Sequence, residues 1–88
     1  MKHYVIAYDI PDDSRRDKVA TLLVSYGERV QLSVFECWLD GSQKKRLRED
    51  LLELIDVAED AVRFYAVAEE VETLGVGKPL QPPNSYVV

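Results

Sequence analysis

The chain has 88 residues, of which 47% are hydrophobic and 31% charged, and its formal net charge is −5 at pH 7. This length allows one small core, so the sequence predicts a single domain over residues 1–88 that association with a second copy would stabilise. The single Cys37 excludes an internal disulfide, and no charged and apolar signal segment is recognised at the start. The apolar runs are too short to cross a bilayer, so we expect a cytoplasmic protein without membrane contact.

The negative charge counts against nucleic-acid binding, because contact with phosphates depends on lysine and arginine. Residues 1–50, however, contain nine basic and nine acidic residues, whereas residues 51–88 contain two basic and seven acidic residues. The basic residues also occur in groups, namely Arg15, Arg16 and Lys18, then Arg29, then Lys44, Lys45, Arg46 and Arg48. A local positive surface on an acidic protein is therefore compatible with the sequence.

Residues 3–9 are predicted to form a β-strand that delivers one carboxylate at its end. Tyrosine, valine and isoleucine favour a pleated surface, and Pro11 lacks the N–H that would continue a ladder. Alternation divides the strand into one face with Tyr4, Ile6 and Tyr8 and another with Val5, Ala7 and Asp9. Both faces are apolar, which indicates that other parts of the protein cover the strand on both sides. Because the strand ends before Pro11, Asp9 lies at the edge of a rigid element.

Two amphipathic helices are predicted. The first has Ser14 as its N-cap and Asp17 in a short capping box, and it runs to about Tyr26, where Gly27 supplies a left-handed stop. The second follows the turn Asp40-Gly41-Ser42, which ends in an N-cap, and reaches about Ile55. Their apolar stripes contain Val19, Leu22, Leu23 and Tyr26 in the first helix, and Leu47, Leu51, Leu54 and Ile55 in the second.

The remaining strands complete the fold prediction. Residues 29–39 are strand-like throughout, which is long for one strand, so we expect a reversal near Ser33 that gives two short strands. Residues 61–68 form another strand, interrupted on one face only by Arg63. The order strand, helix, strand, strand, helix, strand predicts an α+β, ferredoxin-like βαββαβ fold with core residues 3–68, in which both helices cover one face of a four-stranded antiparallel sheet.

The face without helices suggests how the chain associates. It carries apolar residues from the first and last strands, so the simplest arrangement is a homodimer packed sheet to sheet. Residues 71–76 are predicted as an extra C-terminal strand, and the prolines at 79, 82 and 83 make an extended arm toward residues 86–88. We expect residues 69–88 to contact the second copy or another partner, with an unordered terminus as the alternative for the last ten residues.

Three sequence features belong together, namely Tyr8-Asp9-Ile10, the arginine-rich opening of the first helix, and Gly27 with the run RVQLSVFE at residues 29–36. In these features the chain resembles the CRISPR-associated protein 2 family, the small subunit of the spacer-acquisition machinery. The resemblance covers residues 3–68 and implies a homodimer that works with the CRISPR integrase subunit in spacer acquisition. Members of the family are described as endonucleases on single-stranded RNA or double-stranded DNA, and others as scaffolds that hold DNA for the integrase.

The resemblance also implies roles for individual residues. Asp9 of each copy would meet its twin, and two carboxylates brought together either take up a proton or bind a hard cation such as Mg²⁺. Bound Mg²⁺ would lower the pKa of a water molecule and offset charge on a phosphodiester, which implies a metal-dependent endonuclease. On this basis the candidate catalytic residues are Asp9, Tyr8 and Phe35, and the candidate nucleic-acid-binding residues are Arg15, Arg16, Lys18, Arg29 and Ser33.

The residues alone leave alternatives open. Tyr8 and Phe35 are equally explained by core packing, and Asp9 by a turn at the end of a strand. The basic residues of the first helix are also explained as a solvated helix end. His3 is the one histidine, which excludes a histidine-based catalytic or zinc site. Three classes of function therefore compete: a metal-dependent endonuclease, a non-catalytic DNA-binding scaffold of the integrase complex, and a small-ligand regulatory module.

Overall fold

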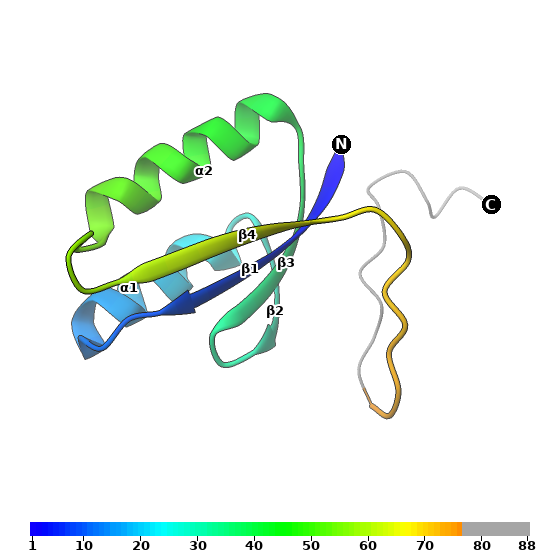
Figure 1. Cartoon of the computed structure of the whole chain (residues 1–88), viewed down its shortest axis with the longest axis horizontal. Helices are drawn as coiled ribbons and strands as arrows, with labels where there is room; N and C mark the ends of the chain where they lie inside the picture. Colours follow the sequence, from blue (N-terminus) through cyan, green and yellow to red (C-terminus); the bar gives the residue numbers. More distant parts are fainter. Residues whose placement is uncertain (77–88) are drawn as a thin grey trace.

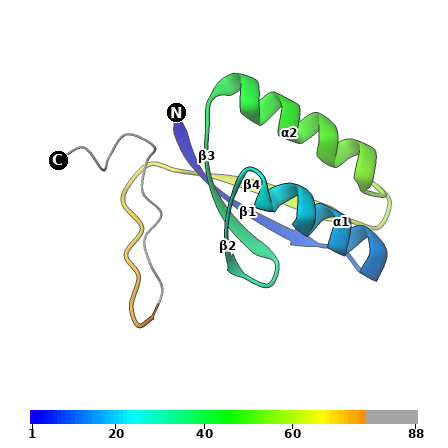
Figure 2. The same ribbon diagram turned by 180° about the vertical axis from the view of Figure 1, so that it is seen from behind.

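A computed structural model of the chain describes residues 1–76 and contains four strands and two helices. In chain order the elements are β1 (Lys2–Asp9), α1 (Asp13–Val24), β2 (Gly27–Gln31), β3 (Val34–Leu39), α2 (Gly41–Leu54) and β4 (Ala61–Val67). The strands form one antiparallel sheet in the order β2-β3-β1-β4. Both helices cover the same face of this sheet (Figures 1 and 2), which confirms the predicted ferredoxin-like fold.

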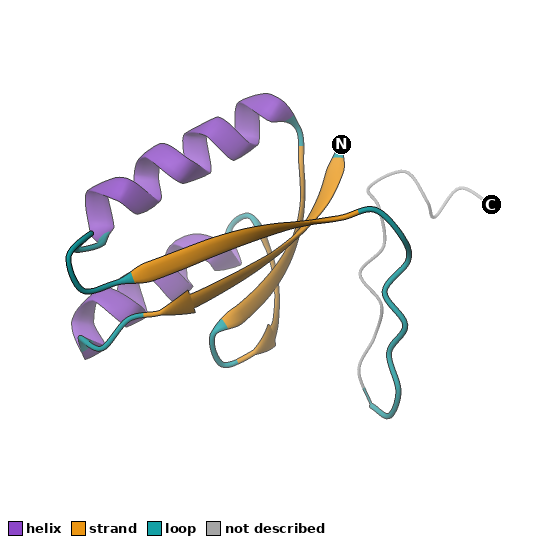
Figure 3. Ribbon diagram, in the orientation of Figure 1, coloured by secondary structure: helices purple, strands orange, loops and turns teal. Residues whose placement is uncertain are grey.

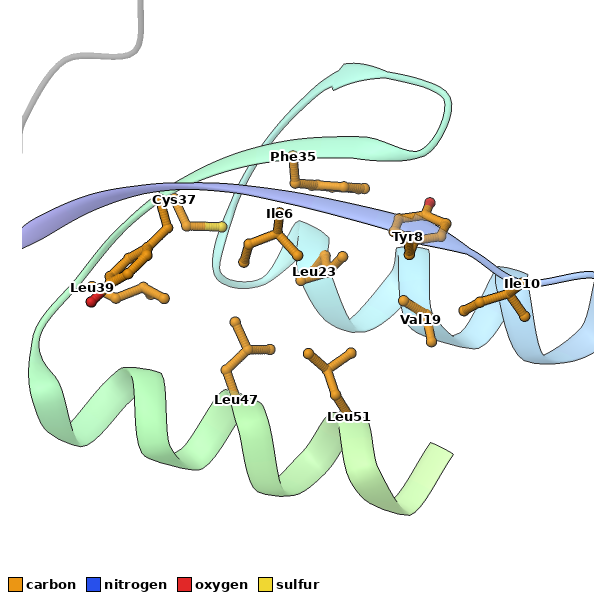
Figure 4. Packing of buried hydrophobic residues seen from close by; sticks show 11 residues of the cluster. Ile6, Tyr8, Ile10, Val19, Leu23, Phe35, Cys37, Leu39, Leu47 and Leu51 are labelled. Atoms are coloured by element: carbon orange, nitrogen blue, oxygen red, sulfur yellow. The ribbon is translucent and has the colours of Figure 1, made fainter. Parts of the chain in front are cut away.

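The core lies between the sheet and the two helices. The β1 side chains predicted to share one face, Tyr4, Ile6 and Tyr8, are all buried there, whereas Asp9 is exposed. Leu47 and Leu51 of α2 point toward the sheet, as do the buried side chains of α1 (Figure 4). The alternation of β1 therefore sets which of its side chains enter the core and leaves Asp9 outside it.

Both helices begin at an aspartate, which corrects the predicted N-caps. Asp12 caps α1, and its carboxylate accepts a hydrogen bond of 2.8 Å from the backbone N–H of Arg15. Ser14 already lies inside the helix. Asp40 caps α2 in a capping box with Gln43, through bonds of 2.7 and 2.9 Å. In each case the aspartate is the last residue with an extended backbone, so it meets the free N–H groups before the predicted serine does.

Gly27 does not have the predicted left-handed conformation. Helix α1 ends at Val24 with Ser25 as its C-cap in a right-handed conformation, and within residues 1–76 the one glycine with positive φ is Gly75. Gly27 instead begins β2, where a Cβ atom would overlap the carbonyl oxygen of Glu36 and the Sγ atom of Cys37. The position requires glycine because two strands approach closely, and not because of its backbone angles.

The predicted reversal near Ser33 is confirmed. Strand β2 ends at Gln31 and β3 begins at Val34, so the chain turns at residues 32–33 (Figure 3). The register between the two strands shifts between Arg29 and Gln31. The backbone N–H of Tyr8 donates to the carbonyl of Ser33 at 3.1 Å, which joins this turn to the end of β1.

The face of the sheet away from the helices carries side chains of mixed character. The register of β1 with β4 places Ala7 opposite Arg63 and Asp9 opposite Ala61. The extra strand predicted at residues 71–76 is not formed in the described part of the chain, where residues 70–74 have no regular secondary structure and residues 75–76 form a turn. The predicted proline arm at residues 79–88 lies outside the described residues. Among residues 1–76, neither helix is long or apolar enough to cross a membrane.

Candidate active site

Asp9 is the exposed carboxylate at the end of β1. It lies at the edge of the sheet face that the helices leave uncovered, opposite Ala61 of β4. Within residues 1–76 its side chain forms no ion pair or hydrogen bond, whereas Asp12, Asp13 and Asp60 are all engaged with other residues. A rigid strand therefore presents an uncommitted carboxylate to the surroundings.

Asp9 lies beside a basic and an aromatic residue that the sequence did not indicate as site residues. A shallow depression of about 240 Å³ is lined by Ala7, Tyr8, Asp9, Ala61, Arg63 and Tyr65. Arg63 donates to Oη of Tyr65 at 3.4 Å, and this bond raises the pKa of Arg63. In the sequence Arg63 is the one polar interruption of its strand, but only the pairing of β1 with β4 brings it near Asp9.

The predicted residues Tyr8 and Arg29 meet on the other side of β1, at the β2–β3 turn. The phenol of Tyr8 donates to the carbonyl oxygen of Leu32 at 3.0 Å. Arg29 donates to the same oxygen through Nε at 3.1 Å and Nη2 at 2.6 Å, and Nη2 lies 3.5 Å from Oη of Tyr8. Both side chains therefore hold the turn, and Tyr8 is otherwise buried with 5% exposure.

Phe35 supports the same turn from inside the core. Its side chain is completely buried, with its ring centroid 6.3 Å from that of Tyr8 and 5.6 Å from the guanidinium carbon of Arg29. The guanidinium lies over the ring, an arrangement that favours a fixed cation. Phe35 has no polar atom and no exposed surface, so any effect on substrate passes through Arg29 and Tyr8. Ser33 lies at the turn and contributes its carbonyl to β1.

The basic residues that open α1 are largely paired with acidic residues of the chain. Arg15 binds both carboxylate oxygens of Asp60, at 2.7 and 3.0 Å, and reaches Glu59 at 3.0 Å. Arg16 donates to the carbonyl oxygen of Ile10 at 3.0 Å and pairs with Asp13. Lys18 is exposed and has no ion pair within the described residues. The structure therefore does not gather the three predicted cations into one free positive surface.

A second group of cations, on α2, has no acidic partner among residues 1–76. Lys45, Arg46 and Arg48 are exposed. Lys44 lies over the rings of Tyr4 and Phe64, with Nζ 5.0 and 5.8 Å from their centroids. A cation without an ion pair is available to a phosphate. Helix α2 carries more such cations than α1, where Arg15 and Arg16 are paired.

The single histidine has structural contacts. His3 Nε2 lies 3.0 Å from Oε1 of Glu36, and both residues are buried. The imidazole ring also stacks on the indole ring of Trp38 at 4.7 Å between centroids. These contacts join β1 to β3 at the end of the sheet where β1 begins, whereas Asp9 lies at the end of that strand.

Asp9 supplies one of the ligands that a hard cation such as Mg²⁺ needs, but not a complete set. Carboxylate oxygen is the ligand that Mg²⁺ prefers, and Mg²⁺ usually keeps several waters beside one or two carboxylates. Residues 1–76 contain no group of three or more histidine, cysteine, aspartate or glutamate side chains able to hold a metal. One chain thus offers one carboxylate, and the remaining ligands must come from water, substrate or a second chain.

Comparison with known proteins assigns the chain to a family. The family model described as CRISPR associated protein Cas2 matches residues 1–73. The CRISPR-associated endonuclease Cas2 2 of Thermus thermophilus is 61% identical over 74 residues, covering 84% of this chain and 82% of that protein. The CRISPR-associated endoribonuclease Cas2 3 of Synechocystis is 46% identical over 89 residues, covering 97% of both.

The fold comparison agrees with the sequence relatives. A chain in the solved structure of a partial Cas6-RT-Cas1–Cas2 complex superposes with a TM-score of 0.68 and 38% identity, covering 75% of this chain and 78% of that one. The match of the family model, the identity to the relatives and the shared fold cover the strands and helices that position Asp9. The chain belongs to the CRISPR-associated protein Cas2 family.

Proposed function

We propose that this chain acts in CRISPR spacer acquisition as a homodimeric, metal-dependent endonuclease on single-stranded RNA or double-stranded DNA. The observation that carries the proposal is the exposed, uncommitted carboxylate of Asp9 at the end of a rigid strand in a Cas2-family chain. Two relatives named as an endonuclease and an endoribonuclease support phosphodiester cleavage. One name specifies RNA as the substrate and the other does not, so the proposal includes both RNA and DNA.

Asp9 is the residue of this chain that would hold the metal. Mg²⁺ bound there would lower the pKa of a water molecule and offset the charge that develops on the phosphodiester. The role of the chain is to fix the carboxylate, which β1 does because Tyr4, Ile6 and Tyr8 anchor the strand in the core. A fixed carboxylate needs little reorganisation when a ligand arrives.

The remaining predicted residues act around this carboxylate. Tyr8 and Arg29 hold the β2–β3 turn through the carbonyl of Leu32, and Phe35 fixes the guanidinium of Arg29. We therefore assign Tyr8 and Phe35 as positioning residues. Lys18 and Arg29 are the best placed for phosphates among the predicted cations, because Arg15 and Arg16 already bind carboxylates.

A homodimer would supply the second carboxylate. The sheet face that carries Asp9 has no helix over it (Figure 1), and Tyr65 of β4 is 48% exposed on that face. Packing of this face against its copy would bury apolar surface and bring the two Asp9 side chains together. Each chain alone offers one ligand, so metal binding is predicted to depend on association.

The test compares wild type with Asp9→Asn on labelled single-stranded RNA and double-stranded DNA, with Mg²⁺ and with chelator. Asp17→Asn is the matched control, because Asp17 is an exposed carboxylate on α1. We expect cleavage by wild type and Asp17→Asn, and loss of cleavage by Asp9→Asn or in chelator, with unchanged folding by circular dichroism. Equal cleavage by Asp9→Asn would refute the metal role of Asp9.

A second candidate function is a DNA-binding scaffold for a Cas1-type integrase. It is favoured by the unpaired cations on α2 and by the similarity to a chain of the partial Cas6-RT-Cas1–Cas2 complex. In that case reversal of charge at Lys45 and Arg48 weakens salt-sensitive DNA binding, while Asp9→Asn leaves binding unchanged. Cleavage assays and binding assays on Asp9→Asn, Asp17→Asn and the charge-reversed variant of α2 separate the two functions.

A further inference from the structure

Arg16 binds the chain directly after Asp9, and the proposed function leaves this arginine without a role. Its Nη1 atom donates to the carbonyl oxygen of Ile10 at 3.0 Å, and its Nη2 atom pairs with the carboxylate of Asp13. Ile10 follows Asp9 and belongs to neither β1 nor α1, whereas Asp13 is the first residue of α1. One guanidinium therefore connects the peptide unit beside the candidate metal ligand to the start of a helix.

The backbone at Asp9 has a neighbouring strand on one side only. The β1–β4 register extends to Asp9, opposite Ala61, whereas the β1–β3 register ends earlier, at Ala7. On the β3 side the last backbone bond is the one from the N–H of Tyr8 to the carbonyl of Ser33. The orientation of the Asp9 side chain therefore depends more than that of its predecessors on what holds the residue that follows.

Ile10 is held from two directions. Its side chain is 3% exposed and lies in the core between the sheet and the helices (Figure 4). Its carbonyl oxygen points the other way and accepts the bond from Arg16. The next two residues, Pro11 and Asp12, are exposed, and proline has no N–H to donate. The bond from Arg16 is therefore a main restraint on the short connection between β1 and α1.

The same contacts set Arg16 apart from a phosphate-binding residue. Its charge is paired with Asp13, so a phosphate would have to compete with a carboxylate of the same helix. The planar guanidinium presents several donors in a fixed arrangement, which suits it to bind a carbonyl and a carboxylate at the same time. These contacts indicate a structural link to the site instead of a contact with substrate.

We propose that Arg16 is a positioning residue that keeps the carboxylate of Asp9 in its orientation through the carbonyl of Ile10. This inference rests on the proposed nuclease function, and it replaces the predicted nucleic-acid contact of Arg16. A carboxylate that is fixed in advance needs little reorganisation when a ligand arrives. Because the role needs no contact between Arg16 and nucleic acid, it applies in the homodimer as well as in the single chain.

The first measurement needs neither metal nor nucleic acid. Order parameters of backbone amides from NMR relaxation show how firmly residues 9–12 are held in wild type, Arg16→Gln and Arg16→Lys. Lys2→Gln is the matched control, because Lys2 is an exposed cation at the opposite end of β1. Light scattering on each variant records the oligomeric state, and circular dichroism records the fold.

In wild type we expect order parameters of about 0.85 at Ile10 and Asp12, the value of a rigid backbone. Arg16→Gln should lower them toward about 0.6, because the carbonyl of Ile10 loses its donor. Arg16→Lys should give intermediate values, since one ammonium group does not span the carbonyl and Asp13 as the guanidinium does. Lys2→Gln should match wild type.

The second measurement follows cleavage of the nucleic acid that wild type cuts, over a range of Mg²⁺ concentrations. Arg16→Gln should lower kcat roughly ten- to a hundredfold, because small displacements of a catalytic group have effects of this size. It should also raise the Mg²⁺ concentration that gives half-maximal cleavage. Binding of a short labelled single-stranded RNA in chelator should match that of Lys2→Gln in affinity and in salt dependence, since neither variant loses a phosphate contact.

Three results overturn the proposal while the nuclease function stands. If the order parameters of Arg16→Gln equal those of Lys2→Gln, the bond to Ile10 does not hold this segment. If Arg16→Gln binds RNA more weakly and its slope of log K against log salt falls by about 0.7, Arg16 contacts a phosphate. If kcat and the Mg²⁺ requirement stay at wild-type values while Asp9→Asn abolishes cleavage, Asp9 acts without help from Arg16.

A fourth result separates failure of the inference from failure of the proposed function. If wild type cuts neither RNA nor DNA, the nuclease function is refuted, and the positioning role of Arg16 is refuted with it. The order parameters would then show only whether Arg16 stabilises the connection between β1 and α1.

Discussion

The guanidinium of Arg15 on the first turn of α1 is bound by both carboxylate oxygens of Asp60, the residue directly before β4. The bonds are 2.7 Å from Nε and 3.0 Å from Nη2, and the two residues lie 45 positions apart in the sequence. The Asp60 side chain is completely covered, and it also accepts the backbone N–H of Asp56 at 2.8 Å. The pair joins α1 to the entrance of β4, so we assign Arg15 to the stability of the fold.

The Arg15–Asp60 pair predicts a pH dependence of stability. The bond from Arg15 lowers the pKa of Asp60 from its ordinary value of 3.8. A carboxyl group with a lowered pKa in the folded state stabilises the fold above its ordinary pKa, and this stabilisation is lost as the pH falls through the lowered value. Wild type should therefore have a higher thermal midpoint than Asp60→Asn at neutral pH, and the difference should shrink below about pH 4.

Thermal melts followed by circular dichroism over a pH series test this expectation. Asp17→Asn is the control, because it removes an exposed carboxylate of α1, and its curve should follow that of wild type. A difference between wild type and Asp60→Asn that stays constant down to acid pH would show that ionisation of Asp60 is not the source of the stabilisation.

The close approach of β2 and β3 at Gly27 predicts a large cost for a single methyl group. Gly27→Ala would place a Cβ atom against the Glu36 carbonyl and the Cys37 sulfur, so one strand must shift. We expect the free energy of unfolding to fall by about 1–3 kcal/mol, measured by urea denaturation. Gly41→Ala adds the same methyl group where no atom lies within 4 Å, and should leave stability unchanged or slightly raised. Equal stability of the two variants would contradict the close approach.

Cys37 is predicted to be unreactive in the folded protein. Its side chain is completely buried, and burial raises the pKa of the thiol to about 11. The thiolate is the reactive species, so a thiol reagent at neutral pH should modify Cys37 only after unfolding. Mass spectrometry of native and urea-unfolded protein after brief alkylation measures this difference. Rapid labelling of the native protein would indicate that β3 opens locally.

The hydroxyl of Tyr8 is predicted to stabilise the β2–β3 turn without taking part in the reaction. Tyr8→Phe removes its bond to the carbonyl of Leu32, which Arg29 continues to hold, so we expect a loss of about 1 kcal/mol in unfolding free energy. Tyr26→Phe removes a phenol that forms no side-chain hydrogen bond within residues 1–76, and serves as the control. Loss of cleavage by a folded Tyr8→Phe protein would instead show that the reaction depends on the hydroxyl.

The sequence alone predicted the elements and the place of Asp9. Alternation in β1 is a local property of the backbone, so it identified the core face with Tyr4, Ile6 and Tyr8 and left Asp9 outside it. Amphipathic spacing identified both helices in the same way. Their N-caps were predicted wrongly, because the aspartate and the serine of an Asp-x-Ser run are both suitable caps and only the backbone conformation decides between them.

The tertiary structure decided which charged groups are available. Arg15 and Asp60 meet because α1 packs beside the entrance of β4, and Arg63 lies near Asp9 because β1 and β4 pair in one particular register. Neither arrangement leaves a signal in the local sequence, since the residues concerned are far apart along the chain. The pairing of distant strands and helices depends on the packing of the whole core. This packing determines which cations lie beside a carboxylate and are neutralised, and which remain free for a phosphate.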